Sequence, residues 1–485
     1  MKGRNLALLT DLYELTMMQG YYETGAYKKQ VVFDLFYRKN PSGNGYAIVA
    51  GLQQAIEYIN DLRFTEEEIA YLEGLHLFSK TFIEYLKDFR FTGEIYAIPE
   101  GTVVFPSEPL MRIKAPIIEA QLVETALLNI VNHQSLIATK ASRVVHAAQG
   151  DPVMEFGLRR AQGPDAGTLG ARAAVIAGCC GTSNVLTGQL YGVPVKGTHA
   201  HSWVMSFPDE LTAFREYAKL FPNACILLVD TYNTLKSGVP HAIQVFNEMK
   251  EAGTLPEKGY GIRLDSGDLA YLSKRARIML DEAGFPDALI SASSDLDENL
   301  ITSLKLQGAK ISLWGVGTKL ITSDDCPAFG GVYKLAAEEG ENGEFLPKIK
   351  LSNNVEKVTN PGIKKIYRIY DKETGKIKAD LIALEEETFS ENLPLRIYDA
   401  NAKWKNMYLP AGSFTLRELL VPIFIDGRLV YECPETMEIQ AYCNREKDTL
   451  WGEHMRLRNP DIVPVDLSDK LNAMKAKLID EMSGI

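Results

Sequence analysis

The chain has 485 residues, of which 46% are hydrophobic and 24% are charged, and its formal net charge is −11. This composition is typical of a globular protein with two or three domains and excludes a disordered chain. The acidic balance excludes a general nucleic-acid binder, which needs a basic surface. No apolar run approaches the roughly 20 residues of a membrane-spanning helix, and the first ten residues lack a signal-peptide pattern. We therefore expect a cytoplasmic protein.

The six cysteines are too sparse for a disulfide framework in a chain of this length, so we expect reduced thiols. Cys433, Cys443 and His454 are the only group close enough in sequence to suggest a metal site. Without a tight Cys-x-x-Cys pair these three residues make a poor zinc site. A structural role is the expectation for all three.

The first region, residues 1–140, alternates helix and strand patterns. The spacing of apolar residues predicts a helix over Leu12–Tyr22, with polar residues before it that can cap it. Val31–Arg38 alternates like a strand, and Glu124–His146 is a long amphipathic run without Gly or Pro. We expect a mixed α+β domain here.

The middle region, residues 141–335, repeats short apolar runs that are followed by polar clusters and helical stretches. The runs that predict strands are Pro152–Phe156, Ala174–Gly178, Val193–Gly197, Cys225–Asp230, Gly259–Leu264, Leu289–Ser293 and Ile311–Gly315. The helical stretches between them include Glu210–Leu220, Val239–Ala252, Leu269–Ala283 and Leu296–Leu306. This alternation predicts a parallel sheet. Seven successive units favour an incomplete TIM-like barrel, with an open doubly wound sheet as the alternative.

The alternation ends before the C-terminal segment, residues 336–485. Short strand-like runs follow at Ile366–Tyr370 and Leu419–Asp426, and a final helix is predicted over Asp466–Met482. Because this segment has no obvious core of its own, we expect it to pack with the N-terminal region. The expected fold class is α/β, with a seven-strand barrel and a mixed α+β domain built from the two terminal segments.

The loops after the strands of such a barrel meet at one face, where active sites form. Polar clusters follow all seven predicted strands: Glu155–Arg160, Gly181–Asn184, Gly197–Ser202, Asp230–Asn233, Arg263–Asp268, Ser293–Asp295 and Gly315–Thr318. A single Asp or Arg at a strand end is often part of a structural ion pair. The convergence of seven clusters is a much stronger indication of an active site.

Several side chains in these clusters suit phosphate groups. The loops after the last two strands commonly bind a phosphate, and Gly315 and Gly317 allow the backbone to approach it closely. Arg159, Arg160 and Arg263 suit a diphosphate or a carboxylate. Together they indicate a phosphorylated sugar with a diphosphate leaving group.

The clusters also contain acids and histidines. Asp230, Asp265 and Asp268 suit the hydroxyls of a sugar or a hard cation such as magnesium. His199 and His201 are two residues apart on an extended segment, so they face the same side. One of them can serve in the site while the other supports it.

The same residues carry a resemblance to a known family. The chain resembles the nicotinate phosphoribosyltransferases over essentially its whole length. The matching motifs are Leu9–Met17, Phe36–Arg38, Glu124–Asn129, Ser135–Lys140, Glu155–Arg160, Gly181–Val185, Gly197–Ser202, Val229–Tyr232, Ile262–Asp268 and Gly315–Thr318. So many motifs in the same order argue strongly against chance.

The resemblance implies a reaction of nicotinate with phosphoribosyl diphosphate in NAD biosynthesis, with ATP as a co-substrate and Mg²⁺ as a cofactor. ATP hydrolysis would be coupled through a phosphorylated histidine, His201, which lies in an Ala-His-Ser pattern, while His199 fills a more variable position. Arg263 and Asp265 would be catalytic. The substrate-binding residues would be Tyr13, Arg38, Phe156, Arg159, Asn184, Thr198, Ser293, Gly315, Gly317 and Thr318.

The resemblance also implies a homodimer with shared active sites. The pyridine ring would stack between Phe156 and Tyr13 of the partner subunit. Arg38 would likewise reach across the interface to the diphosphate.

Three alternatives remain at this point. Nicotinamide phosphoribosyltransferase is related, but it carries an acid where this chain has Asn184; that carboxylate would accept the nicotinamide N–H₂ and repel nicotinate. Quinolinate phosphoribosyltransferases are much shorter and need no histidine phosphorylation. A non-catalytic nucleotide sensor is a third reading, and the intact His201, Arg263 and Asp265 argue against it.

Overall fold

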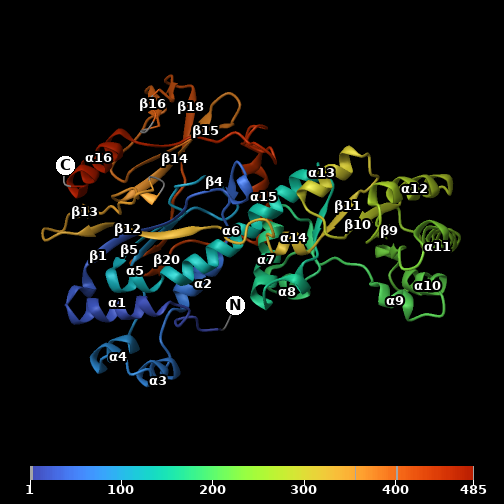
Figure 1. The fold of residues 1–485 in the computed structure, drawn as a ribbon, viewed down its shortest axis with the longest axis horizontal. Coiled ribbons are helices and arrows are strands. Elements are labelled where there is room, and N and C mark those ends of the chain that lie inside the picture. Colours follow the sequence, from blue (N-terminus) through green and yellow to red (C-terminus); the bar gives the residue numbers. More distant parts are fainter. Residues whose placement is uncertain (1–3, 355–356, 400–401, 403, 484–485) are drawn as a thin grey trace. The chain divides into compact units, whose positions relative to one another are not determined.

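The computed structural model describes residues 4–354, 357–399, 402 and 404–483. The chain divides into two compact units (Figure 1). Unit 1 comprises Met1–Thr139, Ala328–Pro434 and Ala441–Ile485, and unit 2 comprises Lys140–Pro327 and Glu435–Gln440. Within the described ranges, no helix has the length and apolar character needed to cross a membrane.

Unit 1 combines helices with antiparallel sheet. Its helices are α1 (Leu12–Glu23), α2 (Leu52–Asp61), α3 (Glu66–Gly74), α4 (Lys80–Lys87), α5 (Ile117–Leu122) and α16 (Asp469–Ser483). The first of these begins where the sequence predicts a helix, because the Glu14 carboxylate accepts the backbone N–H of Asp11 at 3.2 Å. Two further helices, α6 (Glu124–Ala147) and α15 (Thr436–Asp448), each contribute residues to both units.

The larger sheet of unit 1 has seven strands. In order they are β13 (Phe345–Pro347), β12 (Gly331–Glu339), β1 (Gln30–Tyr37), β5 (Met111–Pro116), β3 (Glu94–Ala97), β19 (Val421–Ile425) and β20 (Arg428–Leu429). The antiparallel pairing of β1 with β12 joins the beginning of the chain to the segment that follows unit 2. A second sheet has the order β18 (Phe414–Glu418), β14 (Lys364–Asp371), β15 (Ile377–Leu384) and β21 (Val465–Leu467).

Unit 2 is built around a six-stranded parallel sheet. The strand order is β7 (Gly181–Thr182), β6 (Val153–Glu155), β11 (Leu313–Val316), β10 (Leu289–Ala292), β9 (Gly261–Leu264) and β8 (Ile226–Leu228). Beyond β7, Val195 makes one parallel bridge to Thr182. The order is cyclic, because the first strand in the chain, β6, pairs with the last, β11.

Helices connect and flank these strands. They are α7 (Pro164–Ile176), α8 (Val185–Tyr191), α9 (His201–Met205), α10 (Glu210–Leu220), α11 (Val239–Glu251), α12 (Leu269–Glu282), α13 (Glu298–Leu306) and α14 (Thr318–Ile321). Figure 1 shows α11 and α12 beside β9 and β10. The four helical stretches named from the sequence of this region are confirmed as α10 to α13, with ends that differ by two residues or fewer.

One strand prediction in unit 2 is wrong. The run Ala174–Gly178 forms the end of α7 and the turn after it, while the strand β7 lies further along the chain. A short apolar run does not distinguish a strand from a buried helix, and Pro164 at the start of α7 favours the helix. The predicted strand Val193–Gly197 contributes only the bridge at Val195. The α/β class is confirmed, and the described residues form six strands here where seven were expected.

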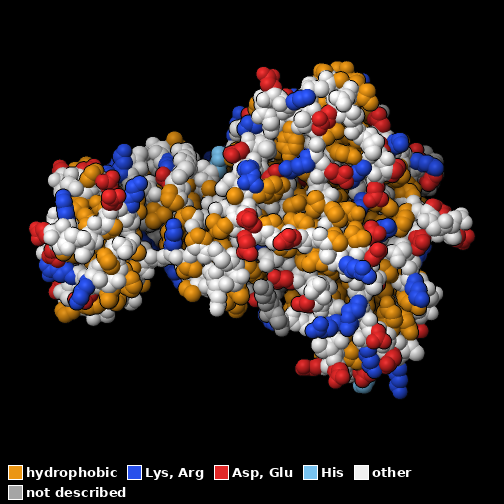
Figure 2. Space-filling model, turned by 180° about the vertical axis from the view of Figure 1, so that it is seen from behind, with side chains coloured by type: hydrophobic (Ala, Val, Ile, Leu, Met, Phe, Trp, Pro, Cys, Tyr) orange, Lys and Arg blue, Asp and Glu red, His pale blue; other side chains and the backbone are white. Residues whose placement is uncertain are grey.

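The surface carries both signs of charge. On the face shown in Figure 2, acidic and basic side chains are interspersed among hydrophobic ones.

Candidate active site

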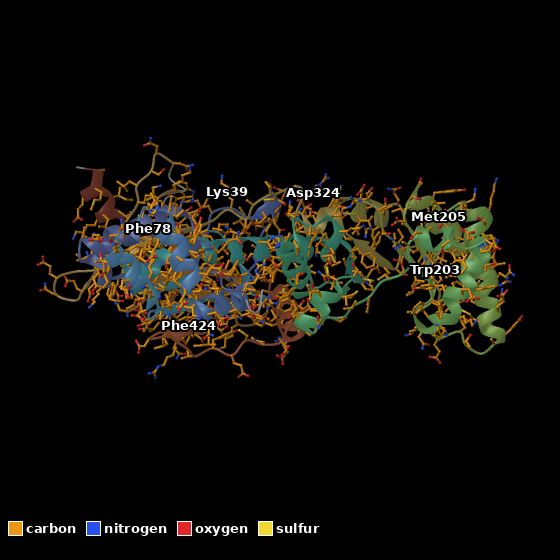
Figure 3. All side chains as sticks on the ribbon, turned by 90° about the horizontal axis from the view of Figure 1, so that it is seen from below. Lys39, Phe78, Trp203, Met205, Asp324 and Phe424 are labelled. Carbon is orange, nitrogen blue, oxygen red and sulfur yellow. The ribbon has the colours of Figure 1, made fainter. Side chains whose placement is uncertain are left out.

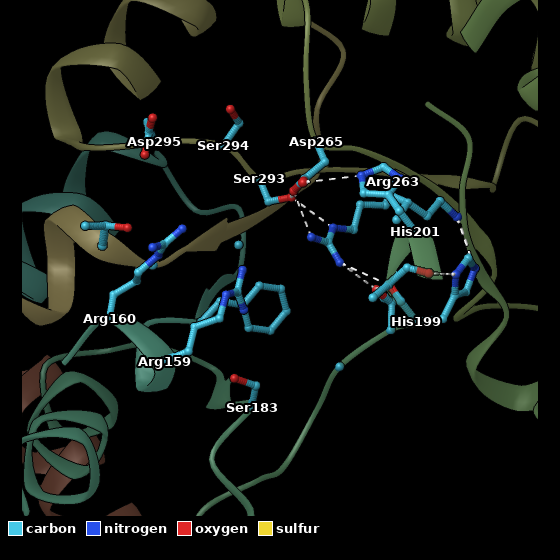
Figure 4. A pocket seen from close by; sticks show the side chains of 18 residues that line it. Arg159, Arg160, Ser183, His199, His201, Arg263, Asp265, Ser293, Ser294 and Asp295 are labelled. Atoms are coloured by element: carbon cyan, nitrogen blue, oxygen red, sulfur yellow. Dashed lines mark hydrogen bonds and ion pairs between the residues drawn. The ribbon is translucent and has the colours of Figure 1, made fainter. Parts of the chain in front are cut away.

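A cavity of about 580 Å³ lies at the carboxyl ends of the strands of unit 2 (Figure 4). It is lined by the loops that follow β6, β7, β9, β10 and β11 and by the segment before α9. The predicted site residues that line it are Phe156, Arg159, Thr198, His201, Arg263, Asp265, Ser293, Gly315, Gly317 and Thr318. The structure therefore brings together residues that are spread over more than half of unit 2's sequence.

Arg263 is held rigidly in the cavity wall. Its Nε donates to Ser293 Oγ at 2.9 Å, its Nη1 to Thr198 Oγ1 at 2.9 Å, and its Nη2 to Asp265 Oδ1 at 2.8 Å. The side chain is only 14% exposed. The planar guanidinium uses its fixed donor directions on three strand-end loops at once, so its orientation is set before any ligand arrives.

Asp265 lies between Arg263 and His201. Burial opposes ionisation of Asp265, but the Ser293 hydroxyl and the Arg263 guanidinium outweigh it and hold its pKa below the ordinary value. His201 Nε2 lies 3.7 Å from Asp265 Oδ2, and its Nδ1 lies 3.0 Å from Thr231 Oγ1. An imidazole oriented between a carboxylate and a hydroxyl is suited to accept and release a phosphoryl group.

Phe156 explains the two glycines in the last strand-end loop. Its backbone N–H donates to the Val316 carbonyl at 2.8 Å, so its ring lies beside β11. A Cβ on Gly315 would lie 2.6 Å from this ring, and a Cβ on Gly317 would lie 3.1 Å from the Phe156 carbonyl oxygen. The glycines therefore make room for Phe156, in addition to any close approach to a phosphate.

The loop after β10 is strained. Ser294 has φ 105° and Asp295 has φ 41°, in the left-handed region that non-glycine residues rarely adopt. Both residues line the cavity. Such conformations cost roughly 1–3 kcal/mol each and concentrate at functional sites. The sequence has no glycine or other signal here that would predict the strain.

Arg159 and Arg160 lie across the cavity from His201 and Asp265 (Figure 4). They belong to the 3₁₀ turn Leu158–Arg160, and both side chains are exposed. Their charge therefore faces the cavity from a turn at its rim.

Asn184 and Ser183 differ from the sequence interpretation. Asn184 is buried at the start of α8, where its Oδ1 accepts the Thr187 backbone N–H at 3.2 Å and its Nδ2 donates to the Gly167 carbonyl at 3.3 Å. The structure does not bring it to the cavity lining. Its neighbour Ser183 lines the cavity instead. After a strand as short as β7, the sequence does not show which of the two polar residues that follow it faces the site.

Asp268 and Asp230 differ in their hydrogen bonding. Asp268 caps α12 by accepting the Tyr271 backbone N–H at 2.9 Å. Asp230 Oδ2 accepts the Asp265 N–H at 2.8 Å, while its Oδ1 is buried without a hydrogen-bond partner in the described parts of the chain. No group of three or more His, Cys, Asp or Glu side chains suited to a metal occurs among the described residues. Cys180, Cys225 and Cys443 are free thiols.

Tyr13 and Arg38 belong to unit 1. The Tyr13 side chain is 45% exposed, and partial burial with the nearby Glu124 raises its pKa to about 12. Arg38 lies near Lys334: burial lowers the pKa of Lys334, the charge of Glu124 opposes this, and the charges of Lys350 and Arg38 add to it. Lys334, Lys350 and Arg38 form a positive group on unit 1, with Glu124 beside it.

Three features define an enzyme that acts on small phosphorylated compounds. They are Arg263, which three hydrogen bonds hold in place (the caged arginine), the pair of Asp265 and His201, and Gly315 and Gly317 at the end of the last strand of unit 2. Three family models match the chain: the nicotinate phosphoribosyltransferase N-terminal domain at residues 8–132, the nicotinate phosphoribosyltransferase family at 152–323, and the C-terminal domain at 363–475. The chain is 48% identical to nicotinate phosphoribosyltransferase of Bacillus subtilis, over 99% of this chain and 96% of the relative. It is 32% identical to the Homo sapiens enzyme, over 96% and 95%.

The solved structures agree with this assignment. The crystal structure of human nicotinic acid phosphoribosyltransferase matches with a TM-score of 0.81 and 30% identity, over 97% of this chain and 100% of that chain. Nicotinate-nucleotide pyrophosphorylase from Pyrococcus furiosus shares the fold, with a TM-score of 0.69 and 22% identity, over 92% of this chain and 96% of that chain. The chain belongs to the nicotinate phosphoribosyltransferase family. It is an enzyme with that activity, which is a step of NAD biosynthesis.

Proposed function

We propose that the chain transfers the phosphoribosyl group of phosphoribosyl diphosphate to the ring nitrogen of nicotinate, releasing diphosphate, and that ATP hydrolysis drives this salvage reaction through phosphorylation of His201. The observation that carries the proposal is the position of His201 in one cavity with Asp265 and Arg263.

Phe156 provides an apolar face for the pyridine ring. Its ring is held beside β11, and the Arg263 guanidinium lies 5.9 Å from its centre. Nicotinate carries a negative charge at neutral pH, so cations near the ring favour it over neutral nicotinamide. Arg263 and Arg159 are the cations assigned to its carboxylate, and Ser183 is added to the residues that face the base because it lines the cavity.

The phosphoribosyl group is assigned to the adjoining part of the cavity, beside Phe156 and Arg263. The Gly315–Thr318 loop and Ser293 would bind its phosphate, with Thr198 beside them. As the bond to diphosphate breaks, positive charge grows on the sugar and negative charge on the leaving group. The carboxylate of Asp265 is suited to the first, and the exposed Arg160 is suited to the second.

Magnesium fits this donor set as a companion of the diphosphate. Asp230 carries a buried carboxylate oxygen without a hydrogen-bond partner among the described residues, and hard oxygen ligands are those that Mg²⁺ prefers. The ion would neutralise charge on the leaving diphosphate. Asp268 is engaged as a helix cap and is not part of this assignment.

The site is proposed to be shared between two copies of the chain. Tyr13 would stack on the base and Arg38 would reach the diphosphate in the partner's cavity. The exposed Tyr13 and the positive group around Arg38 on unit 1 support this assignment. The exposed apolar residues Val185 and Leu186 on α8 offer unit 2 a surface for contact with a second copy.

The proposal includes the fold type and the location. The cyclic order of the parallel sheet, in which β6 pairs with β11, supports an incomplete barrel that lacks a ladder between Val195 and β8 within the described residues. The free thiols of Cys180, Cys225 and Cys443 and a role in NAD biosynthesis support the cytoplasm as the site of action.

The decisive experiment is incubation with ATP labelled on its terminal phosphate. We expect acid-labile, base-stable label on the protein, absent in His201→Ala and still formed, at a lower rate, in His199→Ala. Turnover of nicotinate should depend on ATP, and nicotinamide and quinolinate should be poor substrates in the same assay. Label that persists in His201→Ala and vanishes in His199→Ala would contradict the assignment.

The shared site has its own test. Tyr13→Ala and His201→Ala homodimers should each be almost inactive, while a mixed dimer contains one site with both changes and one with neither. Recovery toward about a quarter of wild-type activity is expected for random mixing under two-fold symmetry. Subunit exchange without recovery would show that each site is built within one chain.

A further inference from the structure

The parallel sheet of unit 2 ends at β8. This strand pairs with β9 on one side, where the Val229 N–H donates to the Arg263 carbonyl at 3.2 Å. The Leu228 N–H, one residue earlier, points to the other edge, where a buried donor needs an acceptor. That acceptor is a side chain: His199 Nε2 lies 3.2 Å from the Leu228 nitrogen.

His199 is fixed by its surroundings. It is 8% exposed, and its ring lies 4.6 Å from the Tyr217 ring of α10 at an interplanar angle of 61°. Tyr217 also contacts Trp203, whose Nε1 donates to the Ala213 carbonyl at 3.1 Å. Trp203 and Met205 of α9 are labelled on the green part of the ribbon in Figure 3. The imidazole is therefore packed between β8 and an aromatic cluster.

The imidazole is suited to accept this hydrogen bond at neutral pH. Because Nε2 accepts an N–H, the ring proton resides on Nδ1, which lies 3.4 Å from the Ala200 carbonyl oxygen. Burial is the main cause that lowers the pKa of His199 to about 4, and the charges of Arg263 and His201 act in the same direction. A neutral ring keeps its acceptor lone pair.

The residues on both sides of His199 take part in the site. Thr198 Oγ1 accepts from Arg263 at 2.9 Å, and His201 Nδ1 lies 3.0 Å from the hydroxyl of Thr231, which follows β8. A bond between His199 and Leu228 thus ties the segment of Thr198 and His201 to the strand that precedes Thr231.

We propose that His199 is a positioning residue, whose neutral imidazole takes the place of a missing neighbour strand of β8 and so fixes His201 for phosphoryl transfer. The kinetic part of this inference rests on the proposed function, whereas the structural part does not. Two properties set its role apart from that of His201: it is buried, and both of its ring nitrogens face backbone groups.

The test compares three substitutions at position 199. His199→Gln can offer its amide oxygen to the Leu228 N–H, His199→Leu fills similar space without an acceptor, and His199→Asn is polar but too short to reach. His241→Gln is the matched control, because His241 belongs to unit 2, contacts Glu210 at 2.8 Å and does not line the cavity. Should His199→Leu fail to fold, His199→Asn replaces it.

The structural measurement is hydrogen exchange of a peptide that covers residues 225–230, with a peptide over β9 as internal reference. We expect faster exchange at Leu228, by about tenfold, in His199→Leu and His199→Asn, consistent with loss of one hydrogen bond. His199→Gln and His241→Gln should exchange as the wild type does. Unchanged protection of Leu228 in His199→Leu and His199→Asn would overturn the inference.

The kinetic measurement is the ATP-coupled reaction of the full-length protein. We expect kcat and the rate of His201 phosphorylation to fall about tenfold or more in His199→Leu, with KM for nicotinate changed less than about twofold. His199→Gln should recover most of the rate. A variant with deprotected Leu228 and wild-type kcat, or His199→Gln with a protected Leu228 and no recovery, would overturn the positioning role. Wild-type protein without nicotinate turnover would contradict the proposed function, and the exchange data would still decide whether His199 holds β8.

Discussion

The two walls of the cavity hold their arginines in different ways. On one wall, Arg263 is only 14% exposed and donates hydrogen bonds to Ser293, Thr198 and Asp265. On the other, Arg159 and Arg160 are exposed and make no ion pair in the described parts of the chain. A caged guanidinium loses little conformational entropy on binding, whereas an exposed one must be ordered by its ligand. The wall that contains Arg263 (the caged wall) is suited to fix the orientation of a ligand. The wall that contains Arg159 and Arg160 (the exposed wall) is suited to supply positive charge.

The largest expected effect is that of replacing the caged arginine. Arg263→Lys keeps the charge but cannot reproduce three hydrogen bonds in fixed directions, so we expect kcat/KM for nicotinate to fall about 100-fold or more. Arg159→Lys keeps the charge at a position without such constraints, and its loss should stay within about tenfold, mainly in KM. Steady-state kinetics with both substrates measure this contrast. Equal losses in the two variants would contradict the difference between the walls.

The caged wall should also be sensitive to acid. The folded-state pKa of His199 is about 4, below the ordinary value of 6.5, so the folded state favours the neutral ring. Its contribution to stability is present above pH 6.5 and is lost as the pH falls from 6.5 to 4, by up to on the order of 3 kcal/mol. Thermal unfolding against pH should therefore be flatter for His199→Gln than for the wild type over this window. Parallel curves would mean that His199 is not buried as a neutral ring.

The sequence predicted the helices and strands that form this wall, but it did not predict the contact between His199 and Leu228. Helices α10 to α13 follow from periodicity, because each has one face to bury. Strands β8 to β11 follow from short apolar runs, because such strands are buried on both faces. The strand-end rule then brought Arg263 and Asp265 to one site. The partner of His199 lies 29 residues away along the chain, and no local pattern reports such a contact.

The remaining misses have local physical causes. Ala174–Gly178 is apolar enough for a strand, yet it completes a helix whose preceding residues favour that state. Ser183 and Asn184 are adjacent polar residues beside a two-residue strand, so their directions depend on a register that the sequence does not contain. Serine does not favour a positive φ, so the surrounding tertiary structure imposes this conformation on Ser294.

Selectivity for the base sharpens the comparison further. Ser183 lines the cavity, whereas Asn184 is buried behind it as the cap of α8. A carboxylate at about 4 Å from that of nicotinate would repel it by on the order of 4 kcal/mol at an effective dielectric near 20. A third of that shifts discrimination about tenfold. We expect Ser183→Asp to shift the ratio of kcat/KM for nicotinate and nicotinamide by at least about tenfold toward nicotinamide.

Asn184→Asp is the matched variant for this experiment. An aspartate can still cap α8, so the fold should survive, but its added charge lies further from the cavity lining. We therefore expect a smaller shift in the same ratio. A larger effect from Asn184→Asp than from Ser183→Asp would mean that Asn184 recognises the carboxylate of nicotinate, as the sequence predicts.

The smallest expected effect concerns the backbone strain in the loop after β10. Ser294 has φ 105°, which a glycine adopts without a steric penalty. Relief of roughly 1–3 kcal/mol of strain, less about 1 kcal/mol for the greater freedom of glycine in the unfolded chain, leaves a gain of about 1 kcal/mol in Ser294→Gly. The same freedom should loosen the loop and raise KM for phosphoribosyl diphosphate by about two- to threefold.

Ser183→Gly is the control, because Ser183 lines the same cavity with an ordinary backbone and should only lose stability. Thermal unfolding of the two variants beside the wild type gives the answer: if Ser294→Gly destabilises the protein as much as Ser183→Gly does, the loop carries no strain, and its rigidity must come from its neighbours.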